Sequence, residues 1–160
     1  MARTRFLAMV PAILLAAATV AACSSGPARP ATLCGRITQV GHLAVTRTGT
    51  FPGDHYHFSF PATMTVSSPA RARAVATAAC ALPAALTAPH TCPRDIGPLY
   101  RLTFLTAADH QLAVITADAT GCRTVAGHLD HARIADSGFW TALGQAMGLA
   151  HPGWNALAGT

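Results

Sequence analysis

Alternating hydrophobic and polar residues predict β-strands in two parts of the chain. Residues 55–66 place aromatic side chains on one face of an extended segment and polar side chains on the other, with Pro61 as a bend. Residues 99–106 alternate in the same way, and the turn after them leads into residues 112–118 as an antiparallel hairpin. The predicted core face of the two alternating segments consists of Tyr56, Phe58, Phe60, Tyr100, Leu102 and Phe104.

Two weaker patterns predict further strands. Residues 36–47 mix β-branched and polar side chains and indicate a first strand with a bulge at Gly41. Residues 123–127 follow a turn and indicate a short late strand. Both are expected to join the same antiparallel sheet.

Helical periodicity appears twice. Residues 70–82 follow a serine cap and a proline, which suits a first helical turn, and Pro83 ends the pattern. A second helix is expected to begin at Asp136 or Ser137 and to stop at Gly148, before a tail, residues 151–160, that is expected to fray. The predicted buried stripes are Val75, Ala78, Ala79 and Leu82 in the first helix, and Phe139, Trp140, Leu143, Ala146 and Met147 in the second.

These elements predict an α+β fold, with a small antiparallel sheet and two helices packed on one of its faces. Residues 33–150 are expected to form a single domain, because their number is close to the common domain size. Half of the chain, 51%, is hydrophobic, which is enough for a core.

The N-terminus has the order of a secretory signal. Residues 1–5 contain two arginines, and residues 6–22 carry no charge and end in small side chains. Alanine is abundant there, Pro11 interrupts the segment and no cluster of positive charge follows it, which disfavours a retained transmembrane helix. We therefore expect residues 1–22 to be a signal peptide.

The end of this segment, Val20-Ala21-Ala22-Cys23, resembles the lipoprotein box of bacteria. The resemblance implies that the Cys23 thiol is diacylated and that cleavage makes Cys23 the first mature residue, a stable membrane anchor. Residues 24–32 are rich in serine, glycine and proline and indicate a flexible tether. The expected location is the cell membrane, with the domain lipid-anchored on the extracytoplasmic side.

Four further cysteines are expected to form two disulfides, because their number is even and the predicted compartment is oxidising. Four cysteines allow three connectivities, and the sequence alone does not choose among them. We favour Cys80–Cys92, which closes a short proline-rich loop, and hence Cys34–Cys122. The cysteines lack the close clustering that a zinc site needs.

The formal net charge of +5 comes from arginines that are scattered along the chain and do not alternate with aromatic residues. This pattern disfavours nucleic-acid binding. Lysine and glutamate are both absent, and this composition, rich in alanine, glycine and proline, resembles that of proteins from high-GC genomes such as those of actinobacteria.

Candidate chemistry is sparse. His55 and His57 share one face of a predicted strand and are the best candidate metal ligands, with Asp54 or His42 as a third. No third ligand has a diagnostic spacing, so we favour a solvated strand face and predict no metal site. The pair His128 and His131, beside Asp130, is a weaker candidate. No glycine-rich phosphate loop or nucleophile elbow occurs, so we expect neither a cofactor nor an enzyme. The isolated aspartates that we interpret as turn, strand-end and cap residues are Asp95, Asp118 and Asp136.

The loop between Cys80 and Cys92 suggests another class of function. Secreted protease inhibitors present a reactive loop that a disulfide holds in place, which lowers the entropic cost of binding. Leu86-Thr87-Ala88 would be the reactive segment here, although the flanking sequence does not match the subtilisin-inhibitor pattern.

Four segments together resemble a group of uncharacterised exported proteins and lipoproteins of actinobacteria. The resemblance covers most of the mature domain and implies export and a shared fold, but no activity. We therefore predict a non-catalytic domain that binds a protein, a peptide or an envelope component near the membrane. The segments are residues 80–83, 92–104, 116–122 and 137–149.

Overall fold

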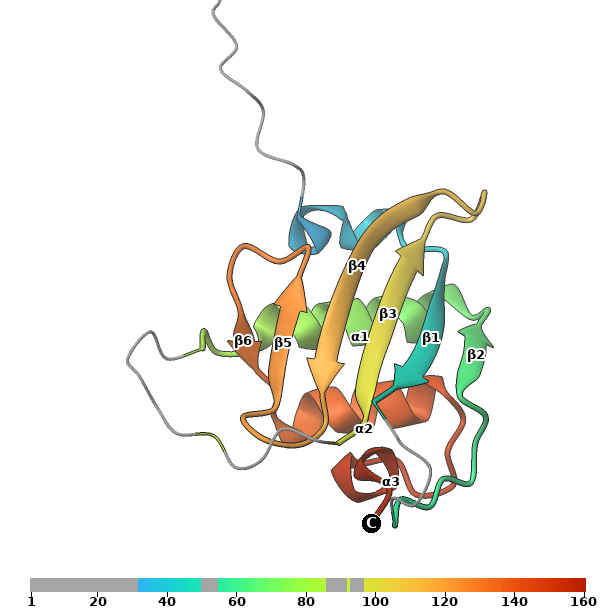
Figure 1. Cartoon of the computed structure of the whole chain (residues 1–160). Helices are drawn as coiled ribbons and strands as arrows, with labels where there is room; N and C mark the ends of the chain where they lie inside the picture. The colour runs from blue at the N-terminus through green and yellow to red at the C-terminus, as the bar shows by residue number, and fades with distance from the viewer. Residues whose placement is uncertain (1–31, 50–54, 86–91, 93–96) are drawn as a thin grey trace, which may run out of the picture.

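The computed structural model describes residues 32–49, 55–85, 92 and 97–160. Its strands form one six-stranded antiparallel sheet, and its two longer helices lie together on one face of that sheet (Figure 1). This arrangement confirms the predicted α+β fold. The elements are η1 (Leu33–Gln39), β1 (His42–Thr48), β2 (Thr63–Val66), α1 (Pro69–Ala81), β3 (Leu99–Leu105), β4 (Gln111–Asp118), β5 (Thr124–Gly127), β6 (Arg133–Ile134), α2 (Ser137–Ala146) and α3 (Trp154–Ala158).

The strand order is β2-β1-β3-β4-β5-β6, and every neighbouring pair is antiparallel. The predicted hairpin of β3 and β4 is confirmed, with Leu102 opposite Ile115. Alternation along β3 also places its predicted core face correctly, because Tyr100, Leu102 and Phe104 are fully buried.

Helix α1 begins where its sequence predicts. The Ser68 hydroxyl accepts a hydrogen bond from the Arg71 amide at 3.4 Å, and Pro69 occupies the first turn, where a missing N–H costs nothing. Val75, Ala79 and Leu82 are buried as predicted, whereas Ala78 is only partly buried and Ala72 and Ala76 complete the buried stripe. The buried residues within α1 itself are Ala72, Val75, Ala76 and Ala79.

Helix α2 has the predicted cap and the predicted buried stripe. The Asp136 carboxylate accepts a hydrogen bond from the Phe139 amide at 2.8 Å, and Gly148 adopts a left-handed φ of 75° just after the helix. Trp140 packs edge-on against Tyr100 of β3, with 6.3 Å between ring centroids. This contact joins the helix layer to the centre of the sheet.

The prediction of one strand over residues 36–47 is wrong in its first half. Residues from Leu33 to Gln39 form the 3-10 helix η1, and β1 begins only at His42. Gly41 separates the two elements, and a Cβ at this position would lie 2.3 Å from the Ala107 amide nitrogen. The close approach of the Ala107 backbone, and not a β-bulge, therefore explains why this position is a glycine.

The prediction of a strand from residue 55 is also wrong, since only Thr63–Val66 pairs as a strand. The alternating burial is nevertheless present: Phe58 and Phe60 pack inward on Arg47, whereas His55 and His57 are exposed. In an extended segment that packs on one side, buried and exposed side chains alternate with the same period of two, even where the segment pairs with no other strand.

The tail does not fray but forms part of the domain. Leu157 and Ala158 of α3 are buried, and the Tyr100 hydroxyl donates a hydrogen bond to the Leu157 carbonyl at 2.6 Å. The His57 amide also donates to the Gly159 carbonyl at 3.1 Å. The fold therefore extends beyond the predicted boundary at residue 150.

Two disulfides are present, but both predicted pairings are wrong. Cys34 pairs with Cys80, and Cys92 pairs with Cys122, with Cα–Cα distances of 5.6 and 5.1 Å. The reason is the position of η1, which packs against α1 and brings Cys34 beside the last turn of that helix. Cys80–Cys92 was predicted from the short length of the loop that it would close, and loop length carries no information about the contact between η1 and α1.

Candidate functional site

One face of the sheet is covered by α1 and α2, whereas no described helix lies on the other face (Figure 1). We call the second surface the open face. Because side chains alternate along each strand, the residues that face away from the core on neighbouring strands form continuous rows. The central row runs across Thr46, Arg101 and Thr116, which the strand register places directly opposite one another.

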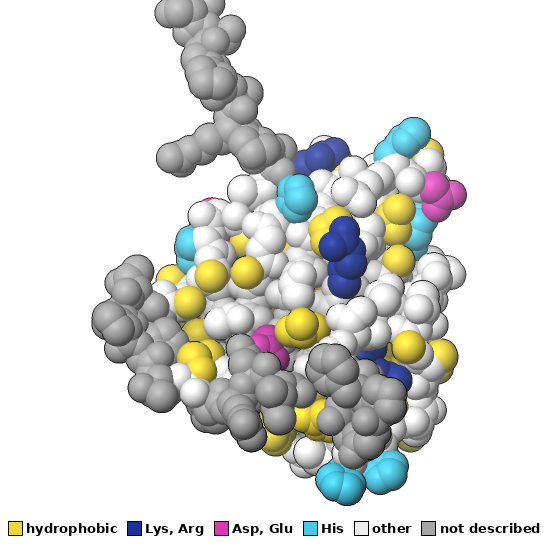
Figure 2. Space-filling model, in the orientation of Figure 1, with side chains coloured by type: hydrophobic (Ala, Val, Ile, Leu, Met, Phe, Trp, Pro, Cys, Tyr) yellow, Lys and Arg dark blue, Asp and Glu magenta, His cyan; other side chains and the backbone are white. Residues whose placement is uncertain are grey.

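Figure 2 views the molecule from the side of the open face. The described residues of this face are mainly threonine and alanine, together with Arg101, Leu99 and, opposite Leu99, Asp118. Leu99 is 37% exposed and is the large hydrophobic residue of the described chain that is most open to solvent. The residues of the open face on the five longer strands include Ala44, Thr46, Thr48, Thr63, Thr65, Leu99, Arg101, Thr103, Val114, Thr116, Asp118 and Ala126, of which Val114 and Asp118 are buried.

Arg101 is the arginine at the centre of this face. It is exposed, and no carboxylate of the described residues forms an ion pair with it. Other arginines have internal roles: Arg73 donates to the Val40 carbonyl at 2.9 Å, and the Arg123 guanidinium lies 4.1 Å from the centre of the Trp154 ring. Among the described residues, Arg101 therefore has no contact comparable with those of Arg73 and Arg123.

The histidines proposed as metal ligands do not converge on a site in the described part of the chain. His55 and His57 are exposed on an extended segment, and His42 instead contacts Asp109, with 2.7 Å between Nε2 and Oδ1. Asp54 lies outside the described residues. The described residues contain no group of three or more side chains that could hold a metal ion.

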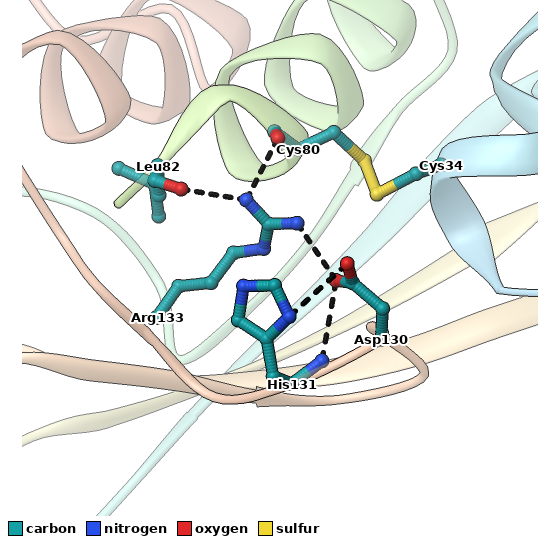
Figure 3. Close-up of a disulfide and its surroundings, with 6 residues drawn as sticks. All are labelled: Cys34, Cys80, Leu82, Asp130, His131 and Arg133. Atoms are coloured by element: carbon teal, nitrogen blue, oxygen red, sulfur yellow. Dashed lines mark hydrogen bonds and ion pairs between the residues drawn. A yellow bond between two sulfur atoms is a disulfide. The ribbon is translucent and has the colours of Figure 1, made fainter. Parts of the chain in front are cut away.

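Of the second histidine candidate, His131 belongs to a network around a buried arginine (Figure 3), whereas the His128 ring nitrogen Nδ1 contacts the backbone of Val114. Arg133 is only 8% exposed and donates to the carbonyls of Cys80 and Leu82, at 2.9 and 2.6 Å. It also pairs with Asp130 at 2.7 Å, while His131 lies 3.1 Å from the same carboxylate. These bonds satisfy the free carbonyls at the C-terminus of α1, so the network fixes the fold beside the Cys34–Cys80 disulfide.

The pKa shifts and hydrogen bonds of the described titratable groups arise from packing within the domain. The Arg133 guanidinium donates a hydrogen bond to Asp130 and holds the pKa of that carboxyl below its usual value. Burial raises the pKa of the Tyr100 hydroxyl, which donates to the Leu157 carbonyl. Asp136 caps α2, and Asp118 accepts a hydrogen bond from the Thr120 amide at 2.9 Å. Asp95 lies outside the described residues.

A hollow of about 640 Å³ lies between the α2–α3 connection and α3. Trp154 lines it, but the Trp154 indole N–H already donates to the Ala119 carbonyl at 2.7 Å, and Arg123 stacks on the ring. The remaining lining is largely small residues, with His151, Asn155 and Thr160 as the polar ones. These three side chains do not form a metal-ligating cluster.

Two predicted site features fall outside the described residues. Cys23 is one, and Leu86-Thr87-Ala88, the candidate inhibitor segment, is the other. The observed pairing also changes the inhibitor hypothesis, because no Cys80–Cys92 bridge closes that loop.

Neither the open face nor Arg101 was among the features predicted from the sequence. The signal was available, because the alternation that places Tyr100 and Leu102 in the core places Leu99, Arg101 and Thr103 on the opposite face. What the pattern cannot reveal is whether a further helix covers that second face.

Comparison with known protein families, with curated proteins and with solved structures finds no match to this chain.

Proposed function

We propose that this chain is an extracytoplasmic lipoprotein that is held at the membrane through Cys23 and that works by binding a partner, without catalysis. The lipoprotein-box pattern before Cys23 supports the anchor. The two disulfides of the folded domain suit an oxidising compartment outside the cytoplasm. No described helix is both long and apolar enough to cross a membrane.

The observation that carries the binding role is the open face of the sheet. Antiparallel sheets can leave one face to solvent, and such a face is usually polar. Here the described part of the face combines several threonines, Leu99 and one central arginine, side chains that can offer a partner both hydrogen bonds and apolar contact. Neither the exposed histidines nor the hollow beside α3 brings together groups that support a competing function.

Hydroxyl-radical footprinting tests this proposal on the full chain. The protein is labelled once in its own membranes and once after extraction and purification, and oxidation is compared residue by residue. We expect Leu99 to be several-fold less oxidised in the membranes, because a bound partner shields it. His151, exposed on the α2–α3 connection, serves as the control and should be oxidised equally in both samples.

Equal oxidation of Leu99 in the two samples would contradict the binding role. The anchor is tested separately by Cys23→Ser, which should move the chain from the membrane fraction to the soluble fraction or leave it unprocessed. Unchanged membrane association of this variant, with an unchanged mature mass, would contradict the lipoprotein assignment.

A further inference from the structure

Resting on the proposed lipid anchor, we infer that acylation of Cys23 comes before oxidation of the other four cysteines, because a free Cys23 thiol would take Cys34 away from Cys80. Acylation then has a second role besides anchoring, since it removes a competing thiol. Three observations carry this inference: the connectivity of the disulfides, the short sequence distance between Cys23 and Cys34, and the position of Cys34 where the chain enters the domain.

Both disulfides join cysteines that are neighbours in the sequence once Cys23 is left out of the count. Cys34 pairs with Cys80, and Cys92 pairs with Cys122. If Cys23 were included, the same rule would pair Cys23 with Cys34 and would leave Cys122 without a partner. The observed connectivity therefore fits a chain with four reactive cysteines, and not one with five.

In an unfolded chain, a free Cys23 thiol competes with Cys80 for Cys34. Residues 24–33 separate Cys23 from Cys34, whereas the sequence separation of Cys34 and Cys80 is 46. Because the probability of loop closure falls with about the 1.5 power of loop length, the shorter loop closes about ninefold more often. Cys23 and Cys34 also precede Cys80 in a chain that is made from its N-terminus. An oxidant that met a free Cys23 would therefore form the wrong bond first.

Folding does not end this competition, because the N-terminal segment enters the domain beside the disulfide (Figure 3). Thr32 directly precedes η1, and Cys34 is the second residue of that helix. Neither Cys34 nor Cys80 is fully buried, so a thiolate can approach the bond from solvent. A chain as long as residues 24–33 spans at most about 35 Å, and a thiol on such a tether has an effective concentration on the order of millimolar.

The competing step is a thiol–disulfide exchange. The Cys23 thiolate attacks the Cys34 sulfur, a bond between these two sulfurs forms, and Cys80 leaves as a thiolate that takes a proton from water. One disulfide replaces another, so the step needs no oxidant. The native bonds form by the same exchange with a protein disulfide, which is reduced to a dithiol. A thioether forms no thiolate, and acylation of Cys23 therefore prevents the attack.

Moving the thiol within the tether tests the inference on the full-length chain. In the Cys23→Ser/Gly26→Cys variant, the thiol follows serines instead of Val20-Ala21-Ala22, so it lacks the lipoprotein box and escapes acylation. Free thiols are alkylated, and the disulfides are then identified by peptide mapping without reduction. We expect the two native bonds in the native chain and in Cys23→Ser. In the Gly26→Cys variant, the added thiol should be bonded to Cys34 in most molecules.

Cys23→Ser/Asn155→Cys is the matched control. It also has five thiols, but the fifth lies on α3, at the end of the domain opposite η1 (Figure 1). Asn155 is exposed, so the substitution does not disturb the core. We expect both native bonds and a free thiol at this position. Equal mispairing in the two variants would overturn the role that we assign to the tether.

The order of the two modifications can be followed on newly made chains. The chains are trapped with an alkylating reagent at successive times after a short pulse of synthesis, and their intact masses are measured. We expect acylated chains with four alkylated cysteines to appear before acylated chains with two disulfides. Chains that hold both disulfides while Cys23 is still a free, alkylatable thiol would overturn the order.

Failure of this inference is distinguishable from failure of the proposed function. Native disulfides in the Gly26→Cys variant, together with an acylated native chain, would overturn the inference and leave the lipid anchor in place. A native chain without acyl groups would overturn the anchor itself and, with it, any order of acylation and oxidation.

Discussion

Arg133 and Arg101 carry the same side chain in opposite environments. The Arg133 guanidinium is buried and bonded to two carbonyls and a carboxylate, whereas the Arg101 guanidinium is exposed without a described ion-pair partner. A buried arginine that loses its contacts leaves polar groups unsatisfied, which is costly, whereas an exposed arginine contributes little to folding. The fold is therefore expected to depend on Arg133 much more than on Arg101.

Arg133→Ala tests the first part of this contrast. The carbonyls of Cys80 and Leu82 lose their donor, so we expect the free energy of unfolding to fall by about 2–4 kcal/mol. Denaturant unfolding monitored by tryptophan fluorescence measures the loss. Arg71→Ala, at an exposed position of α1, should change stability by less than about 0.5 kcal/mol. Equal effects of the two substitutions would show that the network has no stabilising role.

Protonation of Asp130 at acid pH is expected to lower the stability of the folded domain. Its pKa in the folded state lies below the ordinary value because Arg133 donates a hydrogen bond to the carboxylate. A lowered folded pKa means that the contribution to stability is complete above the unfolded pKa and disappears as the pH falls through the folded pKa. Asp130→Asn should therefore destabilise the protein at about pH 7 and have no effect at about pH 2. Urea midpoints measured across this range provide the test, and a difference that grows towards acid pH would have the wrong sign.

At the scale of elements, the sequence predicted the parts whose local signals agree. Helices α1 and α2 have caps and buried stripes, and β3 and β4 have alternation with a turn between them. The errors arose where a local pattern has more than one cause. Alternation in residues 55–60 reflects packing of Phe58 and Phe60 against Arg47, and the disulfide pairing depends on the contact between η1 and α1, which no local pattern encodes.

The candidate site was predictable in part for the same reason. Alternation in β3 separates Tyr100 and Leu102 from Leu99 and Arg101, so the outward set was accessible from the sequence. Its exposure depends on where α1 and α2 pack, which is a property of the whole fold. The prediction that the C-terminal tail frays failed because Tyr100 and Phe58, distant in sequence, hold it.

The docking of α3 can be tested at Gly159. This residue has a φ of 76°, and a Cβ there would lie 2.7 Å from the Phe58 ring, so Gly159→Ala combines backbone strain with a steric clash. We expect a loss of about 1–3 kcal/mol in unfolding free energy and faster removal of the last residues by carboxypeptidase. Gly35→Ala is the matched control, because a Cβ at Gly35 has no neighbour within 4 Å. If the two variants digest at the same rate, the tail is not held by this contact.

At the scale of the molecule, two layers and two disulfides form a domain with one covered and one open sheet face (Figure 1). The described chain enters through η1 at one end of the sheet, and its C-terminus lies at the opposite end. Under the proposed function, the anchor precedes η1 in the sequence and the partner binds the open face. The lipid anchor at Cys23, the two disulfides and the binding role of the open face together form one proposal.

The most direct test is the intact mass of the protein extracted from membranes, measured with and without reduction and thiol alkylation. We predict a chain that begins at Cys23, is heavier than its sequence by the mass of its acyl groups, and shows four alkylatable thiols only after reduction. A chain without acyl groups, or one with free thiols before reduction, would contradict the account of a lipid-anchored and disulfide-closed binding domain.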